Sequence, residues 1–229
     1  MPLAGDRVEA EIRGHLQLIG DAILDGGGRD VGGHVVAGVG RWFTELAAAL
    51  EVSAASQGIV IAGRIAPDVQ IRGNSITAMR QGVHVGVSHH VPVGGEIDRA
   101  GRVVITDNVV QVTVLPTVRG ARHGIFVGNV DSLRIEDNRI TTVRPGTGFA
   151  RKALEGIRLF GWIGKMAVIQ QNHLSGFGDG DTGIFFNALN DVADGQRSIW
   201  RVTNNLAEGA ETVVDKGITT HLFNSGNKG

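Results

Sequence analysis

Cysteine and tyrosine are absent from this sequence, and aromatic residues account for only 5% of its 229 residues. Without cysteine the chain has no disulfide bond, no thiol nucleophile and no thiolate ligand for a metal. The scarcity of aromatic rings weakens the case for a broad aromatic platform that stacks against sugars.

A strong charge of either sign is also missing. The chain has 22 basic and 23 acidic residues, for a formal net charge of -1. A nearly neutral chain offers no global attraction for nucleic acid or for an anionic membrane surface. No stretch approaches the roughly 18 apolar residues that a membrane-spanning helix needs. We therefore expect neither nucleic acid nor a membrane as a partner.

The composition favours one elongated domain with a buried core, because apolar residues make up 42% and charged residues 20%. The first residues, Met1 to Asp6, lack the basic stretch and apolar run of a secretory signal peptide. The compartment stays open between the cytoplasm and a secreted protein trimmed of its signal.

Glycine is abundant, at 35 residues. No collagen-like triplet occurs, so we interpret the glycines as turn residues. Many of them open a short alternating apolar pattern. The pattern occurs at Gly58-Ile59-Val60-Ile61, Gly82-Val83-His84-Val85, Gly124-Ile125-Phe126-Val127, Gly156-Ile157-Arg158-Leu159, Gly183-Ile184-Phe185-Phe186 and Gly217-Ile218-Thr219-Thr220.

A second pattern alternates with the first and is an apolar alternation that ends in asparagine and then an apolar residue. The asparagines are Asn74, Asn108, Asn138, Asn172 and Asn205, at steps of 34, 30, 34 and 33 residues. The period of two within each unit indicates strands, and the Gly, Asn, Asp and Ser between them indicate turns. Repeats of this kind bury their apolar side chains by stacking. The sequence therefore predicts an all-β chain folded as a right-handed parallel β-helix.

In that fold, asparagine suits the left-handed backbone of a tight bend, and stacked asparagine amides can hydrogen-bond from coil to coil. The Gly-Ile strand openings and the asparagine turn resemble the pectate-lyase-like superfamily of right-handed β-helices, from about Gly58 to the C-terminus. The resemblance implies that polysaccharide lies on the face built by the Gly-Ile strands. It does not imply one activity, because that fold hosts many.

We expect two segments, a cap over residues 1–57 and the β-helix over residues 58–229. Within the cap, Arg41 to Glu51 is rich in helix formers and predicts a short helix, and residues 7–25 predict a degenerate first coil. The residues 224–229 offer no cap. Open coil ends would favour association of copies into a homo-oligomer.

Alternation in the Gly-Ile strands places one side chain in each strand on the outside. The expected outward row is Val60, His84, Phe126, Arg158, Phe185 and Thr219, followed by Gly86, Gly128, Phe160, Asn187 and His221. Aromatic, cationic and polar groups together suit a sugar or uronate ligand. The alternative is an ordinary solvated sheet face.

The segment from Thr117 to Arg158 carries eight basic and four acidic residues. We therefore predict an anionic polysaccharide or oligosaccharide as the partner. The residues expected to bind it are Arg122, Phe126, Arg151, Glu155 and Phe185. The alternative is that these charges pair with their neighbours.

Two short stretches resemble polygalacturonases: His123-Gly124 resembles their His-Gly strand, and Gly156-Ile157-Arg158 resembles their Gly-x-Arg-x-Lys strand. Phe160 stands in place of the lysine, and Arg80-Gln81 stands where those enzymes carry paired aspartates. Hydrolysis of that type needs two carboxylates. We therefore reject polygalacturonase activity for this chain.

Two functions remain open. The favoured one is a non-catalytic module that binds an anionic glycan or a protein, because the expected outward row has no carboxylate. The alternative is a lyase or epimerase acting on uronate polymers, with His84, His123 and Arg158 as catalytic residues and Glu155 orienting a histidine. No cofactor or metal is expected, although Asp179 and Asp181 offer a weak calcium site.

Overall fold

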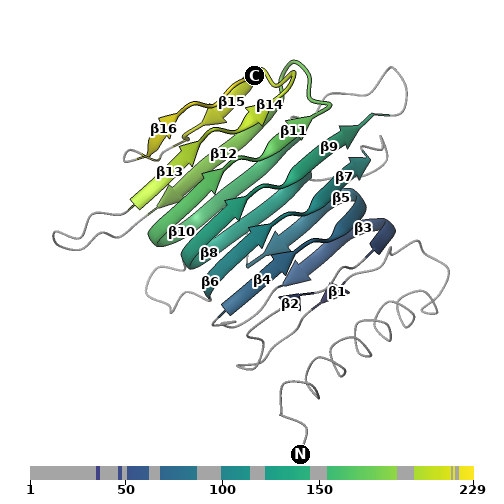
Figure 1. The fold of residues 1–229 in the computed structure, drawn as a ribbon, viewed down its shortest axis with the longest axis horizontal. Coiled ribbons are helices and arrows are strands. Elements are labelled where there is room, and N and C mark those ends of the chain that lie inside the picture. Colours follow the sequence, from purple (N-terminus) through teal and green to yellow (C-terminus); the bar gives the residue numbers. More distant parts are fainter. Residues whose placement is uncertain are drawn as a thin grey trace, which may run out of the picture.

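The computed structural model describes residues 35–36, 46–47, 51–61, 68–86, 99–113, 122–144, 154–189, 199–217, 219 and 222–229. Within these residues the regular structure consists of 16 strands in one continuous sheet, with no helix (Figure 1). No described helix is therefore available that could cross a membrane. The prediction of an all-β parallel solenoid is confirmed.

The strands form three parallel ladders, and the chain adds a strand to each ladder in turn. Ladder A contains β2 (Leu46–Ala47), β4 (Asp68–Arg72), β6 (Ala100–Thr106), the ends of β8 (Arg122–Glu136) and β10 (Leu154–Gln170), β13 (Ile199–Thr203) and β16 (Phe223–Ser225). Ladder B contains the starts of β3 (Glu51–Ile61) and β5 (Ser75–Val85), then β7 (Val109–Thr113), β9 (Arg139–Val143), β11 (His173–Ser175) and β14 (Leu206–Ala207). Ladder C contains β1 (Val35–Val36), the ends of β3 and β5, the starts of β8 and β10, β12 (Thr182–Leu189) and β15 (Thr212–Asp215).

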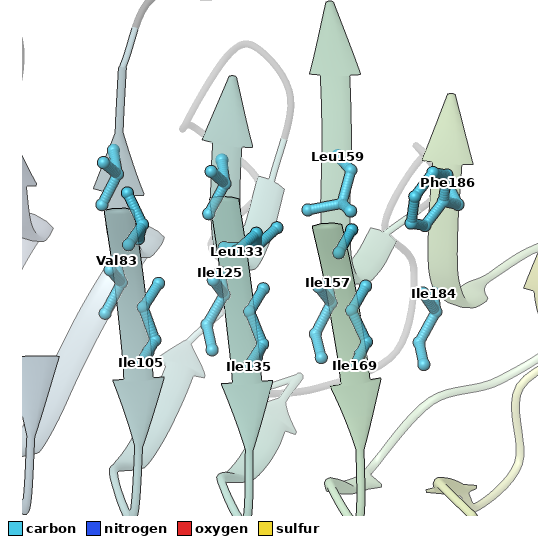
Figure 2. Packing of buried hydrophobic residues seen from close by; sticks show 14 of the residues in the cluster. Val83, Ile105, Ile125, Leu133, Ile135, Ile157, Leu159, Ile169, Ile184 and Phe186 are labelled. Carbon is cyan, nitrogen blue, oxygen red and sulfur yellow. The ribbon is translucent and has the colours of Figure 1, made fainter. Parts of the chain in front are cut away.

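The core lies between the ladders and is built from stacked apolar side chains. In Figure 2, Ile125, Ile157 and Ile184 form a row on ladder C, and Ile105, Ile135 and Ile169 form a row on ladder A. All six side chains are fully buried. In these strands of ladder C the residue that follows the glycine of the Gly-Ile pattern therefore points inward, as the alternation predicts. A coil alone could not bury these side chains, so stacking stabilises the fold.

The glycine of the Gly-Ile pattern is required by packing against ladder B. A Cβ atom added at Gly124 would lie 2.4 Å from Cγ2 of Ile140 and 2.7 Å from the carbonyl oxygen of Gly156. At the equivalent positions, a Cβ atom added at Gly82 would overlap Val110, and one added at Gly156 would overlap Leu174. The side chain of ladder B thus occupies the space that a larger residue would need.

The predicted asparagine ladder is present. Asn138 Oδ1 accepts hydrogen bonds from the backbone N (3.1 Å) and Nδ2 (2.8 Å) of Asn108. Asn138 Nδ2 lies 2.9 Å from Asn172 Oδ1 and 2.8 Å from the carbonyl of Ile105. The same contacts link Asn205 to a further member that the spacing did not predict, Asn227.

One detail of this turn corrects the sequence interpretation. The ladder asparagine itself does not adopt the left-handed conformation; the residue before it does. These preceding residues have positive φ and are Gly73, Asp107, Asp137, Gln171, Asn204 and Gly226. The ladder asparagines are instead buried, or partly buried at Asn227, and hydrogen-bonded between coils, because their amides replace backbone partners at the bend.

The described part of residues 1–57 already belongs to the solenoid. β3 begins at Glu51 and pairs with β5 from that residue onward. Leu46–Ala47, inside the range predicted as a helix, form β2 and pair with β4. The other residues of that range before Glu51, and all of residues 7–25, lie outside the described residues.

Candidate functional site

The outward side chains of ladder C form one aligned row across adjacent strands, which we call the ladder C wall. His84 of β5 lies opposite Phe126 of β8, Phe126 opposite Arg158 of β10, and Arg158 opposite Phe185 of β12. Val60 of β3 extends the row next to His84. The parallel register therefore brings together residues that are 24 to 42 positions apart in the sequence, as expected.

The last member of the row differs from the expectation. Phe185 lies opposite Asp215 of β15, not opposite Thr219. Thr219 is buried, and its hydroxyl lies within hydrogen-bond distance of the Phe186 and Ala188 carbonyls, at 2.9 and 3.0 Å. Gly217, with a φ of 52°, belongs to a turn and does not open a strand. The wall thus includes a carboxylate, which the sequence interpretation had not placed there.

Arg158 is held between aromatic rings. Its guanidinium carbon lies 5.1 Å from the ring centre of Phe160 and 5.0 Å from that of Phe185. Its Nη1 donates to both carboxylate oxygens of Glu155 at 2.9 Å. The side chain remains 24% exposed. Two rings and one carboxylate therefore orient the guanidinium while part of it reaches solvent.

Behind Arg158 the wall contains two histidines and a buried phenyl ring. His123 Nδ1 lies 3.1 Å from Glu155 Oε2, and the His123 side chain is only 3% exposed. The His84 ring stacks on Phe126 with centroids 4.4 Å apart, and the His123 ring lies 5.7 Å from the same phenyl ring. Phe126 is 2% exposed, so its ring supports the histidines and offers little surface to a ligand.

Burial favours the neutral form of both imidazoles. Burial lowers the pKa of His84 to about 4, against a raising contribution from its contact with the Gly86 carbonyl. Burial also lowers the pKa of His123, although the Glu155 carboxylate opposes that shift. Burial alone would raise the pKa of Glu155, but His123 and Arg158 outweigh it and lower that pKa. Near neutral pH the site therefore favours neutral imidazoles beside the Glu155–Arg158 ion pair.

Among the described residues, no other arginine predicted to bind the glycan is presented beside Arg158 on the ladder C wall. Arg122, at the start of β8, is buried rather than presented to solvent. Arg151 lies outside the described residues. Within the basic segment, Arg134 contacts Glu136, and Arg144 contacts Asp181. Much of the described positive charge is thus balanced locally.

The loop at Asp181 has a structural role. Its carboxylate accepts backbone N–H groups from Leu154 at 3.1 Å and Gly178 at 2.9 Å, in addition to the contact with Arg144. These partners use the oxygens that calcium would need. Among the residues that the structure describes, no group of three or more acidic, histidine or cysteine side chains could hold a metal ion.

Two contributors to the site were missed at the sequence level. Phe160 was placed on the outside but not beside the Arg158 guanidinium, although its position two residues along the same strand was a usable signal. Asp215 precedes the pattern at Gly217 and carries no motif. Its place depends on the register of β15 against β12.

Comparison of the chain with protein-family models, curated proteins and solved structures finds no match in any of the three.

Proposed function

We propose that this protein is a carbohydrate-binding β-solenoid of the pectate-lyase-like type, and that its ladder C wall binds an acidic glycan. Arg158 receives a carboxylate of the glycan. The observation that carries this proposal is the position of the guanidinium between Phe160 and Phe185, with Glu155 fixing its orientation.

The chemistry of Arg158 favours a planar anion. The contacts with Glu155 use Nη1, and the opposite edge, formed by Nε and Nη2, matches the two oxygens of a carboxylate. The two phenyl rings lie about 5 Å from the guanidinium carbon and lower the local polarity, which strengthens a hydrogen bond made at the edge of the guanidinium. Because Glu155 balances the charge, recognition depends on directed hydrogen bonds more than on a long-range field.

Retention on immobilised uronate polymers tests this function. We expect Arg158→Ala to weaken retention by about 10- to 100-fold, the size of a lost charged hydrogen-bond pair. Arg134→Ala is the matched control, because Arg134 is a partly exposed arginine on ladder A with its own carboxylate partner. Equal retention of wild type and Arg158→Ala, or none by the wild type, would refute the proposal.

A second candidate function is elimination or epimerisation at a uronate, favoured by the neutral histidines close to Arg158. A neutral imidazole can take the C5 proton while the arginine stabilises the charge that develops on the carboxylate. In elimination, the electrons of the C5–H bond form a double bond to C4, and the C4–O bond breaks with the oxygen taking up a proton.

The two functions are separated by product formation. A lyase would generate an unsaturated product with a new ultraviolet absorbance, and an epimerase would exchange the C5 hydrogen with deuterated water. Either signal, lost in His84→Ala or His123→Ala, would establish catalysis. Binding without either signal leaves the wall as a recognition surface only.

A further inference from the structure

The outward surface of β10 continues beyond Arg158. Phe160 and Trp162 are partly exposed and alternate with buried residues of the same strand, so three successive outward side chains are a cation and two aromatic rings. Gly161, with a φ of 86°, has a left-handed backbone where the chain passes from ladder C to ladder A, and the register between β8 and β10 shifts at this point.

Trp162 has a defined place at this corner. Its backbone N–H donates to the side-chain oxygen of Asn129 at 2.8 Å, and Asn129 is itself buried with a φ of 52°. The Arg99 guanidinium lies 4.6 Å from the indole ring centre, and Arg99 Nε lies 3.2 Å from Asp131 Oδ1. Side chains from three neighbouring coils therefore meet at a partly exposed indole.

A contribution to stability alone does not explain why Trp162, Arg99 and Asp131 lie together at the surface. Arg99 and Asp131 are 43% and 49% exposed, and an ion pair with that exposure contributes little to the stability of the fold. A partly exposed indole leaves apolar surface in water. The part of the indole that the Arg99 guanidinium does not cover, however, offers an apolar contact for the C–H face of a sugar ring, and Arg99 and Asp131 offer hydrogen-bond partners for its hydroxyls.

The spacing fits a chain of sugars. Trp162 lies four positions after Arg158, so their backbone positions are at most roughly 13 Å apart at the rise of a strand, and the bend at Gly161 shortens this separation. That upper limit leaves room for more than one pyranose ring. Along the perpendicular direction, Phe126 on β8 is 2% exposed and cannot form a contact surface of useful size. On the other side, Phe185 of β12 packs against the Arg158 guanidinium, and the next residue of the row is Asp215, whose carboxylate would repel an acidic glycan. The exposed path therefore follows β10.

We propose that Phe160, Trp162 and the Arg99–Asp131 pair form a second subsite, which binds a neighbouring sugar ring of the same acidic oligosaccharide. This inference rests on the proposed function, in which Arg158 receives the carboxylate of the first ring. The glycan lies along β10 and not along the axis of the solenoid. The ligand is then an oligosaccharide of more than one residue that carries at least one uronate.

Calorimetry with galacturonate, glucuronate, mannuronate and their oligomers of increasing length tests the subsite. We expect the oligomers to bind about tenfold more tightly than the monomer, since an aromatic contact and its polar partners are worth about 1 kcal/mol or more. Trp162→Ala and Arg99→Ala should remove most of that gain and leave the affinity for the monomer unchanged. Phe223→Ala is the control, because Phe223 is 58% exposed on ladder A.

Indole fluorescence supplies an independent readout. Addition of the oligomer, but not of the monomer, should change the emission of the wild type, and Trp162→Phe should abolish the change. Arg99 is surface-exposed, so Arg99→Ala tests the subsite even where Trp162→Ala fails to fold.

The outcomes separate the two proposals. Affinity that does not grow with chain length, or a loss in Trp162→Ala and Arg99→Ala no larger than in Phe223→Ala, overturns the subsite and leaves the role of Arg158 standing. If the wild type binds none of these uronates, the proposed function fails and the subsite fails with it.

Discussion

At the scale of single residues, the asparagine ladder is the polar contact on which the turns depend. Asn138 bonds to the coil before it and the coil after it, and its side chain is almost fully buried. We expect Asn138→Ala to lower the free energy of unfolding by about 3 kcal/mol, because several buried backbone groups lose their partner. Urea denaturation followed by circular dichroism measures the change.

The matched control for this prediction is Asn227→Ala. Asn227 belongs to the same ladder but is only partly buried, and it bonds to Asn205 on one side. We expect a loss of about 1 kcal/mol there, since water can replace part of the lost bonding. Equal losses of stability at Asn138 and Asn227 would contradict the idea that burial between two coils determines how much each ladder asparagine stabilises the fold.

A second residue-scale prediction concerns the glycine column. Gly124→Ala should lower the free energy of unfolding by about 1–3 kcal/mol, because the added methyl group would overlap Ile140 and the backbone of Gly156. Gly178→Ala is the control, since the nearest atom to its added Cβ is Arg144 Nη1 at 3.4 Å. Thermal denaturation of both variants compares them directly. A stability loss at Gly178 as large as that at Gly124 would argue against steric overlap as the cause.

At the scale of elements, the contact of β5, β8 and β10 on the ladder C wall makes stability depend on pH. The pKa of His84 falls from 6.5 to about 4 on folding, so the unfolded chain binds the proton more tightly. The contribution of His84 is complete above about pH 6.5 and is lost as the pH falls toward 4. Glu155, whose pKa is also lowered, acts in the same direction at lower pH.

We therefore expect the free energy of unfolding to decrease on acidification, with His84 accounting for as much as about 3 kcal/mol. His84→Phe keeps a ring against Phe126 and removes the titrating group. Denaturant midpoints measured between about pH 7.5 and 4 should fall less steeply in this variant. Parallel curves for wild type and variant would show that His84 is not a source of the pH dependence.

The sequence predicted the strands and their register better than it predicted the contacts between side chains. The alternating patterns and the recurrence of asparagine every 30 to 34 residues predict the strands and the register, because each coil must repeat the apolar positions of the one before it. The row from His84 to Phe185 followed from that repeat. Thr219 did not, because the turn at Gly217 interrupts the repeat and a strand without the motif, β15, takes its place.

The chemistry of the site was harder to predict for a related reason. Exposure depends on neighbours from other coils, so alternation placed Phe126 on the outside without showing that His84 and His123 help to bury it. The charge count of the basic segment likewise could not show that Arg158 would find Glu155 three residues earlier on the same strand. Pairing and burial are properties of the folded wall and not of the motif.

At the scale of the whole molecule, a solenoid is stabilised mainly by contacts between neighbouring coils, so a complete coil should be removable. Deletion of residues 109–138 joins Asn108 to Arg139. Asn108 then replaces Asn138 beneath Asn172, and the start of β9 lies on β5 in place of β7. Isoleucine and valine positions of the core stay in register, because the deletion equals one step of the asparagine spacing.

We expect this variant to retain a β-sheet circular dichroism spectrum and cooperative unfolding, with a lower Tm because one interface between coils is lost. Deletion of residues 109–121 is the control, since it removes β7 and leaves an incomplete coil with its apolar neighbours unpaired. That control should aggregate or unfold without cooperativity. If the complete-coil deletion behaves like the partial one, the coils are not equivalent units, and the stacking that aligns His84, Arg158 and Phe185 has another cause.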